Sequence, residues 1–214
     1  MADPDSTESL KIQTSDGFQL VAQLRSPADP IITVAICHPH PLYGGDMYSN
    51  VVAALFDHLA GQGAACIRFN FRGSGGSEGQ HDEGGAERLD VTAALDALDS
   101  RWPDLPTILA GYSFGADVSL AVDDERIDAW FAVAPPLRVV PTAEMMAGPD
   151  PREKVIVTGS VDDFRPPEQV TGIVDSWQNT SLTVAEGANH FFASGLGTVR
   201  DTAAELLSRL TAAS

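Results

Sequence analysis

Short apolar runs with strand-like and helix-like spacing alternate along the chain. Residues 31–37 form a continuous apolar run that ends at a proline-rich loop, as expected of a strand buried on both faces of a sheet. Residues 47–62 instead place their apolar side chains at helical spacing and stop at Gly61 and Gly63. This alternation predicts an α/β protein with a mostly parallel sheet and helices on both faces.

The pattern predicts about eight strands, with helices between most of them after the third. The strands are expected at residues 9–14, 18–25, 31–37, 65–71, 107–112, 127–133, 155–159 and 181–185. The helices are expected at residues 47–62, 86–102, 114–122, 167–178 and 199–211. Residues 135–153 are rich in proline and are expected to be irregular. A single domain over residues 1–214 is predicted, with residues 1–8 as a flexible tail.

Acidic side chains outnumber basic ones, and this excludes some classes of binding partner. The 30 acidic and 13 basic side chains give a net charge of −17, which repels nucleic acid and anionic lipid. No apolar run approaches the ~18–20 residues of a membrane helix, and the acidic first residues do not resemble a secretory signal. No membrane or nucleic-acid partner is therefore expected.

The two cysteines, Cys37 and Cys66, both lie inside apolar runs. They are expected to be buried thiols in a reducing compartment, which favours a cytoplasmic protein. A disulfide between them would require adjacent strands, which the predicted topology allows.

The five residues from Gly111 to Gly115, Gly-Tyr-Ser-Phe-Gly, fit the pattern G-x-S-x-G. They lie where a predicted strand ends and a predicted helix begins, which is the position of a nucleophile elbow. On such a turn the hydroxyl of Ser113 projects above the sheet. Glycines two residues on either side let the strand and the helix approach each other. The motif therefore makes Ser113 the candidate nucleophile.

Three stretches together carry a family resemblance. They are residues 38–45 (His-Pro-His-Pro-Leu-Tyr-Gly-Gly), residues 68–73 (Arg-Phe-Asn-Phe-Arg-Gly) followed by Gly75, Ser77 and Gly79, and residues 111–116. The chain resembles the α/β-hydrolase superfamily, in particular a compact, cap-less bacterial group of serine hydrolases similar to dienelactone hydrolases and esterases. The resemblance implies the α/β-hydrolase fold without a cap domain, and a serine hydrolase with no cofactor.

A catalytic serine needs a histidine base and an acid, which follow it in the chain in that fold. His190 is the only histidine after Ser113, and its loop resembles the family's catalytic-histidine loop. The acid is expected just after the strand at residues 155–159. The family spacing G-x-x-D indicates Asp162, and its neighbour Asp163 remains an alternative.

An oxyanion hole takes one backbone N–H from the residue after the nucleophile, here Phe114. The second is expected from the loop that starts at His38. Pro39 and Pro41 have no N–H, so His40 and Leu42 remain, and His40 matches the usual position.

Two other patterns are weaker. His38 and His40 form a His-x-His pair, but no third histidine lies nearby and Asp46 is off spacing, so no metal site is expected. The glycines of residues 73–79 lack the Lys-Ser/Thr of a phosphate loop, so a tight turn is expected, with Arg72 held by Glu78 or by carbonyls. His81 is expected to face solvent, or else to line the pocket.

About 19 residues separate Ala134 from Lys154, too few for a helical cap. The cleft at Ser113 is thus expected to be open, and on so acidic a protein it favours small neutral or cationic esters. Its edges are expected to be Leu42, Tyr43, Tyr112, Pro135, Pro136, Leu137, Met145 and Met146. The sequence therefore predicts a serine hydrolase that cleaves an ester or related acyl bond of a small-molecule substrate. A peptidase or acyltransferase on the same triad, and a non-catalytic binding protein, remain alternatives.

Overall fold

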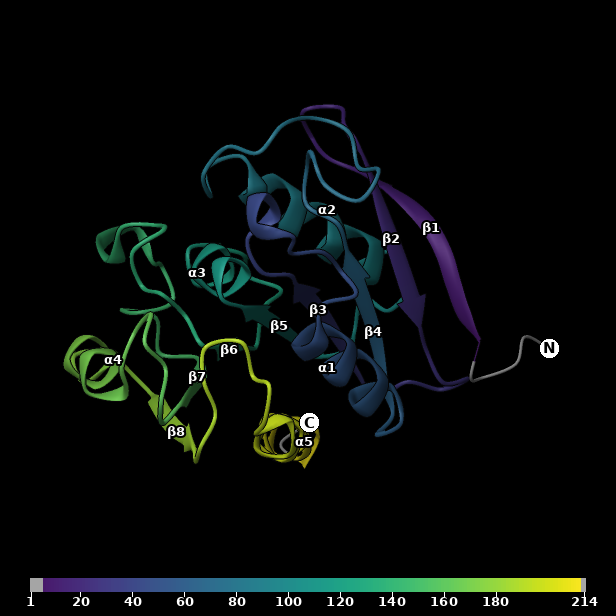
Figure 1. Cartoon of the computed structure of the whole chain (residues 1–214). Helices are drawn as coiled ribbons and strands as arrows, with labels where there is room; N and C mark the ends of the chain where they lie inside the picture. Colours follow the sequence, from purple (N-terminus) through teal and green to yellow (C-terminus); the bar gives the residue numbers. More distant parts are fainter. Residues whose placement is uncertain (1–5, 213–214) are drawn as a thin grey trace.

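A mostly parallel sheet of eight strands forms the centre of the structure, a computed structural model that describes residues 6–212. The strands are β1 (Thr7–Gln13), β2 (Gln19–Arg25), β3 (Ile32–Cys37), β4 (Ala64–Phe69), β5 (Thr107–Tyr112), β6 (Ala129–Val133), β7 (Glu153–Gly159) and β8 (Thr180–Ala185). Their order across the sheet is β1-β2-β4-β3-β5-β6-β7-β8 (Figure 1). β1 and β2 pair antiparallel with their neighbours, whereas β3 to β8 run parallel. The predicted fold class is confirmed.

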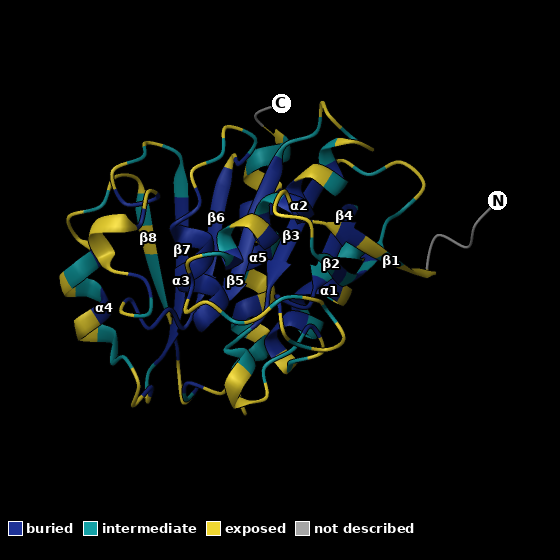
Figure 2. Cartoon of the chain, turned by 90° about the horizontal axis from the view of Figure 1, so that it is seen from above, coloured by how far each residue is buried: buried dark blue, intermediate teal, exposed yellow. Residues whose placement is uncertain are grey.

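Five helices cover the two faces of this sheet. They are α1 (Asn50–Ala60), α2 (Glu87–Asp99), α3 (Phe114–Leu120), α4 (Pro167–Val174) and α5 (Leu196–Ala212). The buried apolar side chains of α1 and α5 belong to one core cluster, and those of α2, α3 and α4 belong to the other. The sheet is therefore buried between two apolar layers, and its central strands are dark blue in Figure 2.

Strand burial follows position in the sheet. β3, β5 and β6 are buried at every residue, which explains their continuous apolar sequences. In β2 the pattern alternates between buried and half-buried residues, because only one of its faces packs on the core. The edge strand β8 is mostly half-buried or exposed.

Two predicted elements end early for identifiable reasons. The strand expected at residues 65–71 ends at Phe69, where the Asn70 side chain and the Phe71 N–H begin to bond to residues of loops. The Asn70 side chain accepts the Met47 N–H at 2.9 Å, and the Phe71 N–H donates to His38 Nε2 at 3.0 Å. The helix expected at residues 167–178 ends at Val174, since the Gln178 N–H donates to the Gly148 carbonyl instead of a helical one.

The flexible tail predicted at residues 1–8 does not include Thr7 and Glu8. Residues 1–5 lie outside the described residues. Thr7 and Glu8 already belong to β1, opposite Arg25 and Leu24 of β2, and the Glu8 carboxylate pairs with Arg101 at 2.9 Å. The strand pairing and this ion pair hold Thr7 and Glu8 in the sheet.

No cap covers the sheet between β6 and β7. Residues 134–152 contain one short 3-10 helix, η2 (Thr142–Glu144), and otherwise follow an irregular path. Leu137, Val140 and Met145 of this segment are buried in the core, so it lies down on the body of the protein. The predicted absence of a cap is confirmed. No helix within residues 6–212 is long and apolar enough to cross a membrane.

Candidate active site

Ser113 occupies a strained turn between β5 and α3. Its φ of 53° and ψ of −117° lie outside the regions that L-residues favour, as expected at a nucleophile elbow. The flanking glycines are required by close packing. A Cβ at Gly111 would lie 2.3 Å from the Gly115 carbonyl oxygen, and one at Gly115 would lie 2.5 Å from the His38 carbonyl oxygen. The turn thus projects Ser113 from the end of β5.

The three predicted triad residues lie in one hydrogen-bonded row. Ser113 Oγ is 2.9 Å from His190 Nε2, and His190 Nδ1 is 2.9 Å from Asp162 Oδ2. All three side chains are buried or nearly so. A carboxylate can only accept a hydrogen bond, so the imidazole donates from Nδ1 and leaves Nε2 free to accept from the serine.

The neighbouring carboxylates of Asp162 and Asp163 have different surroundings in the structure. Asp162 is 2% exposed and its Oδ1 accepts the backbone N–H groups of Phe164 and Arg165 at 2.8 and 3.0 Å. Asp163 is exposed, and within residues 6–212 its carboxylate accepts no hydrogen bond and forms no ion pair. The geometry therefore favours Asp162 as the partner of His190.

The histidine loop is tied to two other elements. The Tyr112 hydroxyl donates to the His190 carbonyl at 2.9 Å, and this tyrosine is buried beside Ser113. The side-chain amide of Asn50, at the start of α1, donates to the carbonyls of Phe191 and Phe192. These bonds hold the backbone that carries the imidazole. The sequence indicated Tyr112 only as a cleft residue and gave no signal for Asn50.

Two backbone N–H groups beside Ser113 are available to an oxyanion. Within residues 6–212, neither His40 N–H nor Phe114 N–H has a hydrogen-bond partner. The loop that contains His40 is held by hydrogen bonds within itself, because the His40 carbonyl accepts the N–H groups of Tyr43 and Gly45. Both His40 and Phe114 line the same cavity as Ser113.

A cavity of about 690 Å³ opens at Ser113 and His190. Of the predicted edge residues it includes Tyr43, Tyr112 and Pro136. It also includes residues that the sequence did not single out, among them Ser49, Asn50, Arg138, Val139, Phe164 and Phe191. Aromatic rings from three loops, those of Tyr43, Phe164 and Phe191, therefore border Ser113.

Five predicted cleft residues do not line this cavity: Leu42, Pro135, Leu137, Met145 and Met146. Leu137 and Met145 are 3% and 1% exposed because they pack into the core. Pro135, two residues after the end of β6, is buried as well. Leu42 and Met146 are 72% and 42% exposed and face solvent instead. The prediction was wrong for these residues because an apolar side chain in an irregular segment can turn toward the core, solvent or cleft.

His38 and His40 serve different contacts and do not converge. His38 is fully buried, its Nε2 accepts the Phe71 N–H, and burial lowers its pKa to about 4. His40 is half-buried, and its Nδ1 accepts the Leu42 N–H at 3.3 Å. Within residues 6–212 no group of three or more His, Cys, Asp or Glu side chains is arranged to hold a metal ion.

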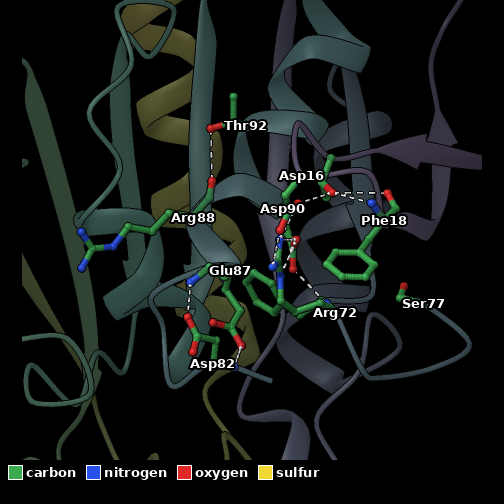
Figure 3. A network of polar contacts seen from close by, with 12 residues as sticks. Asp16, Phe18, Arg72, Ser77, Asp82, Glu87, Arg88, Asp90 and Thr92 are labelled. Atoms are coloured by element: carbon green, nitrogen blue, oxygen red, sulfur yellow. Dashed lines mark hydrogen bonds and ion pairs between the residues drawn. The ribbon is translucent and has the colours of Figure 1, made fainter. Parts of the chain in front are cut away.

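Arg72 anchors the glycine loop through partners other than the expected Glu78. Its guanidinium pairs with Asp90 at 2.7 Å and with Asp16 at 2.9 Å, as the cluster in Figure 3 shows. Because Arg72 is buried between these carboxylates, it joins the β1–β2 turn to α2. Glu78 instead accepts the Gln19 N–H.

His81 lies against His40 and Phe114 and does not face solvent or line the cavity at Ser113. Its side chain is 10% exposed, and Nδ1 is 2.7 Å from the buried Glu87 Oε1. Its ring packs 4.8 Å from the ring of His40 and 5.2 Å from that of Phe114. Both predictions for His81 were therefore wrong, because its ring packs against the rings of His40 and Phe114 instead.

Comparisons with known proteins agree with this architecture. The chain matches the family model described as serine aminopeptidase, S33, over residues 29–190. An uncharacterised protein of Rickettsia prowazekii (strain Madrid E) is 33% identical over 181 residues, which cover 80% of this chain and 75% of the relative. An α/β serine hydrolase homologue from Coxiella burnetii is 35% identical, with a TM-score of 0.85 over 94% of this chain and 97% of that one.

A second solved structure bears on the missing cap. It is an α/β serine hydrolase without a lid from Xanthomonas campestris, 26% identical, with a TM-score of 0.85 over 97% of this chain and 96% of that one. The family match spans most of the chain and includes Ser113, Asp162 and His190. The chain therefore belongs to the serine aminopeptidase S33 family of the α/β-hydrolase superfamily.

Proposed function

We propose that this hydrolase is a carboxylic ester hydrolase that acts on a small acyl substrate through Ser113, His190 and Asp162. The observation that carries the proposal is the pair of 2.9 Å hydrogen bonds that joins the three side chains beside an open cavity. A serine with such a base and acid is equipped for nucleophilic attack on an acyl carbon.

In the proposed reaction, Ser113 Oγ attacks the ester carbonyl while His190 Nε2 takes its proton. Asp162 holds the imidazole by Nδ1 and stabilises the imidazolium that forms. The tetrahedral oxyanion accepts the N–H groups of His40 and Phe114. The imidazolium then protonates the departing alcohol, and water releases the acyl group from Ser113 by the reverse sequence.

The name of the matching family suggests an aminopeptidase as the second candidate. An aminopeptidase binds a protonated α-amine, which a carboxylate in the cavity would stabilise. Among the described residues, none that lines this cavity is Asp or Glu. This favours an ester without a free amine as the substrate. Acyl transfer would use the same triad and differ only in the final acceptor.

A fluorophosphonate probe combined with two substrates tests the proposal. The probe should label Ser113, and Ser113→Ala should abolish both labelling and hydrolysis of p-nitrophenyl butyrate. Ser49→Ala, which changes another serine of the same cavity, serves as the matched control and should keep both. Turnover of alanine p-nitroanilide faster than of the ester would favour the peptidase. An unlabelled Ser113 without turnover would favour a binding protein.

The proposed place of action is the cytoplasm. Within the described residues both cysteines are free and buried. Unpaired thiols of this kind fit a reducing compartment.

A further inference from the structure

The charge inside the catalytic cavity is opposite to the charge of the protein. The chain carries 30 acidic and 13 basic side chains. Yet the described residues that line the cavity include Arg138 and two histidines but no Asp or Glu. The cleft therefore differs from the negatively charged one expected from the composition. Its permanent charge is positive.

Arg138 also differs from most other arginines of the chain in lacking a partner. The sequence has eleven arginines. Within residues 6–212, nine of them donate a side-chain hydrogen bond or form an ion pair. Arg138 and Arg200 are the two for which the described residues offer no side-chain partner, and only Arg138 lines the cavity. Its five N–H donors are therefore free to bind a ligand.

The loop that carries Arg138 is held by a buried carboxylate. Asp117 of α3 is 0% exposed and accepts the backbone N–H groups of Leu137, Arg138 and Val139 at 2.8, 2.9 and 2.9 Å. Leu137 takes a left-handed φ of 52°, which is strained for a residue with a branched side chain. Leu137 is buried in the core while the next residue, Arg138, is exposed at the cavity. The fold thus fixes Arg138 at this wall.

The same loop is fixed relative to the reacting groups. Asp117 lies one helical turn after Ser113, and its N–H donates to the Ser113 carbonyl at 3.2 Å. On the other side, Arg165 Nε donates to the Pro136 carbonyl at 2.7 Å, while the Arg165 N–H binds the Asp162 carboxylate. The wall that bears Arg138 is therefore connected to both the nucleophile and the acid.

We infer that Arg138 is a specificity-determining residue that binds a carboxylate of the substrate, which makes hemi-esters of dicarboxylic acids the favoured substrate class. The inference rests on the proposed ester hydrolysis and adds the identity of one substrate group. The planar guanidinium matches a carboxylate through two parallel hydrogen bonds, and the apolar rings around the cavity reduce competition from water. An amine-bearing substrate would be repelled by the same charge.

Methyl esters of matched shape test this inference without an activated leaving group. The hemi-esters, each with one free carboxylate, are monomethyl succinate, monomethyl glutarate and monomethyl adipate. The neutral counterparts carry a primary amide in place of the free carboxylate, and methanol release is followed by proton NMR. The best hemi-ester should have a kcat/KM at least tenfold above that of its amide. Arg138→Gln should bring this ratio close to one, and Arg138→Lys should give an intermediate ratio because it keeps the charge but loses the planar fork.

Arg200→Gln is the matched control, since Arg200 is an unpartnered arginine outside the cavity, and it should leave the ratio unchanged. A ratio near one in the wild type, or a ratio that Arg138→Gln does not lower, would overturn the inference. Failure to cleave any of these methyl esters while p-nitrophenyl butyrate is cleaved would also overturn it. Loss of activity toward every ester, activated or not, would instead count against the proposed function.

Discussion

Phe164 lies flat against the imidazole of His190, with ring centroids 4.3 Å apart and an interplanar angle of 19°. The Phe164 N–H donates to Asp162 Oδ1, so the same residue is bonded to the carboxylate that orients the imidazole. Its ring is 45% exposed and therefore stands between His190 and solvent. We conclude that Phe164 restrains the histidine.

Replacing Phe164 by alanine is expected to lower kcat on p-nitrophenyl butyrate about two- to tenfold. Stacked aromatic pairs are worth ~0.5–1.5 kcal/mol, and a freed imidazole spends less time in line with Ser113. Phe164→Tyr should retain most of the activity. Phe191→Ala removes a more exposed ring that meets His190 edge-on at 5.7 Å, and it should have the smaller effect. The opposite order would argue against a restraint by stacking.

Asp162→Asn is expected to lower kcat at least a thousandfold, since the amide no longer stabilises the correct histidine tautomer. Asp163→Asn, one residue away and exposed, should stay within twofold of the wild type. Adding Asp162→Asn to Ser113→Ala should cause little further loss, because the triad acts as one unit. Steady-state kinetics of the wild type, the three single variants and the double variant measure these effects. Near-normal activity of Asp162→Asn would show that the acid is misassigned.

Gly115→Ala is expected to destabilise the protein or prevent its folding. The new methyl group would lie 2.5 Å from the His38 carbonyl oxygen and 2.6 Å from that of Cys37. Overpacking of this kind commonly costs ~1–3 kcal/mol or more. Gly172→Ala, in α4 with no atom within 4 Å of the new methyl group, should instead stabilise by up to ~1 kcal/mol. Thermal unfolding compares the two, and equal effects would contradict the steric explanation.

Acidification should destabilise the wild type through His38. Burial lowers the pKa of His38 to about 4, whereas an unfolded histidine titrates near ~6.5. Between these values the unfolded chain binds a proton that the native state excludes. The stabilising contribution present above pH ~6.5 is therefore lost as the pH falls toward 4.

The test compares the wild type with His38→Asn in urea at pH 7, 5.5 and 4.5. From pH 7 to pH 4.5 the free energy of unfolding of the wild type should fall by up to ~3 kcal/mol relative to that of the variant. Burial raises the pKa of Asp90 and of Asp117 to about 6, which acts in the opposite direction. These two groups are present in both proteins, so their effects cancel in the difference. If the difference in the free energy of unfolding between the two proteins were the same at all three pH values, His38 would not titrate in this way.

The elements and the position of Ser113 were predictable because each rests on a local pattern. Apolar runs located the strands, and the spacing of Gly111 and Gly115 placed Ser113 on its turn. The choice between Asp162 and Asp163 was not local. It depends on a turn that directs the first carboxylate toward His190 and two backbone N–H groups.

The cavity wall was far less predictable than the triad. Whether Leu137 or Arg138 faces the cleft depends on the left-handed backbone at Leu137 and on three bonds to Asp117, which lies 20 residues earlier. Long-range contacts of this kind leave no periodicity in the sequence. His81 shows the same limit, because a polar loop gave no sign that its ring would pack on Phe114.

The two cysteines lie on neighbouring strands but belong to opposite core clusters, Cys37 to the one under α2 and α3 and Cys66 to the one under α1 and α5. Burial raises the pKa of both thiols, so neither reacts while the sheet is covered. Each thiol is consequently an internal reporter for one face of the sheet. Pulsed alkylation read by mass spectrometry would show whether the two helical layers open together or one before the other.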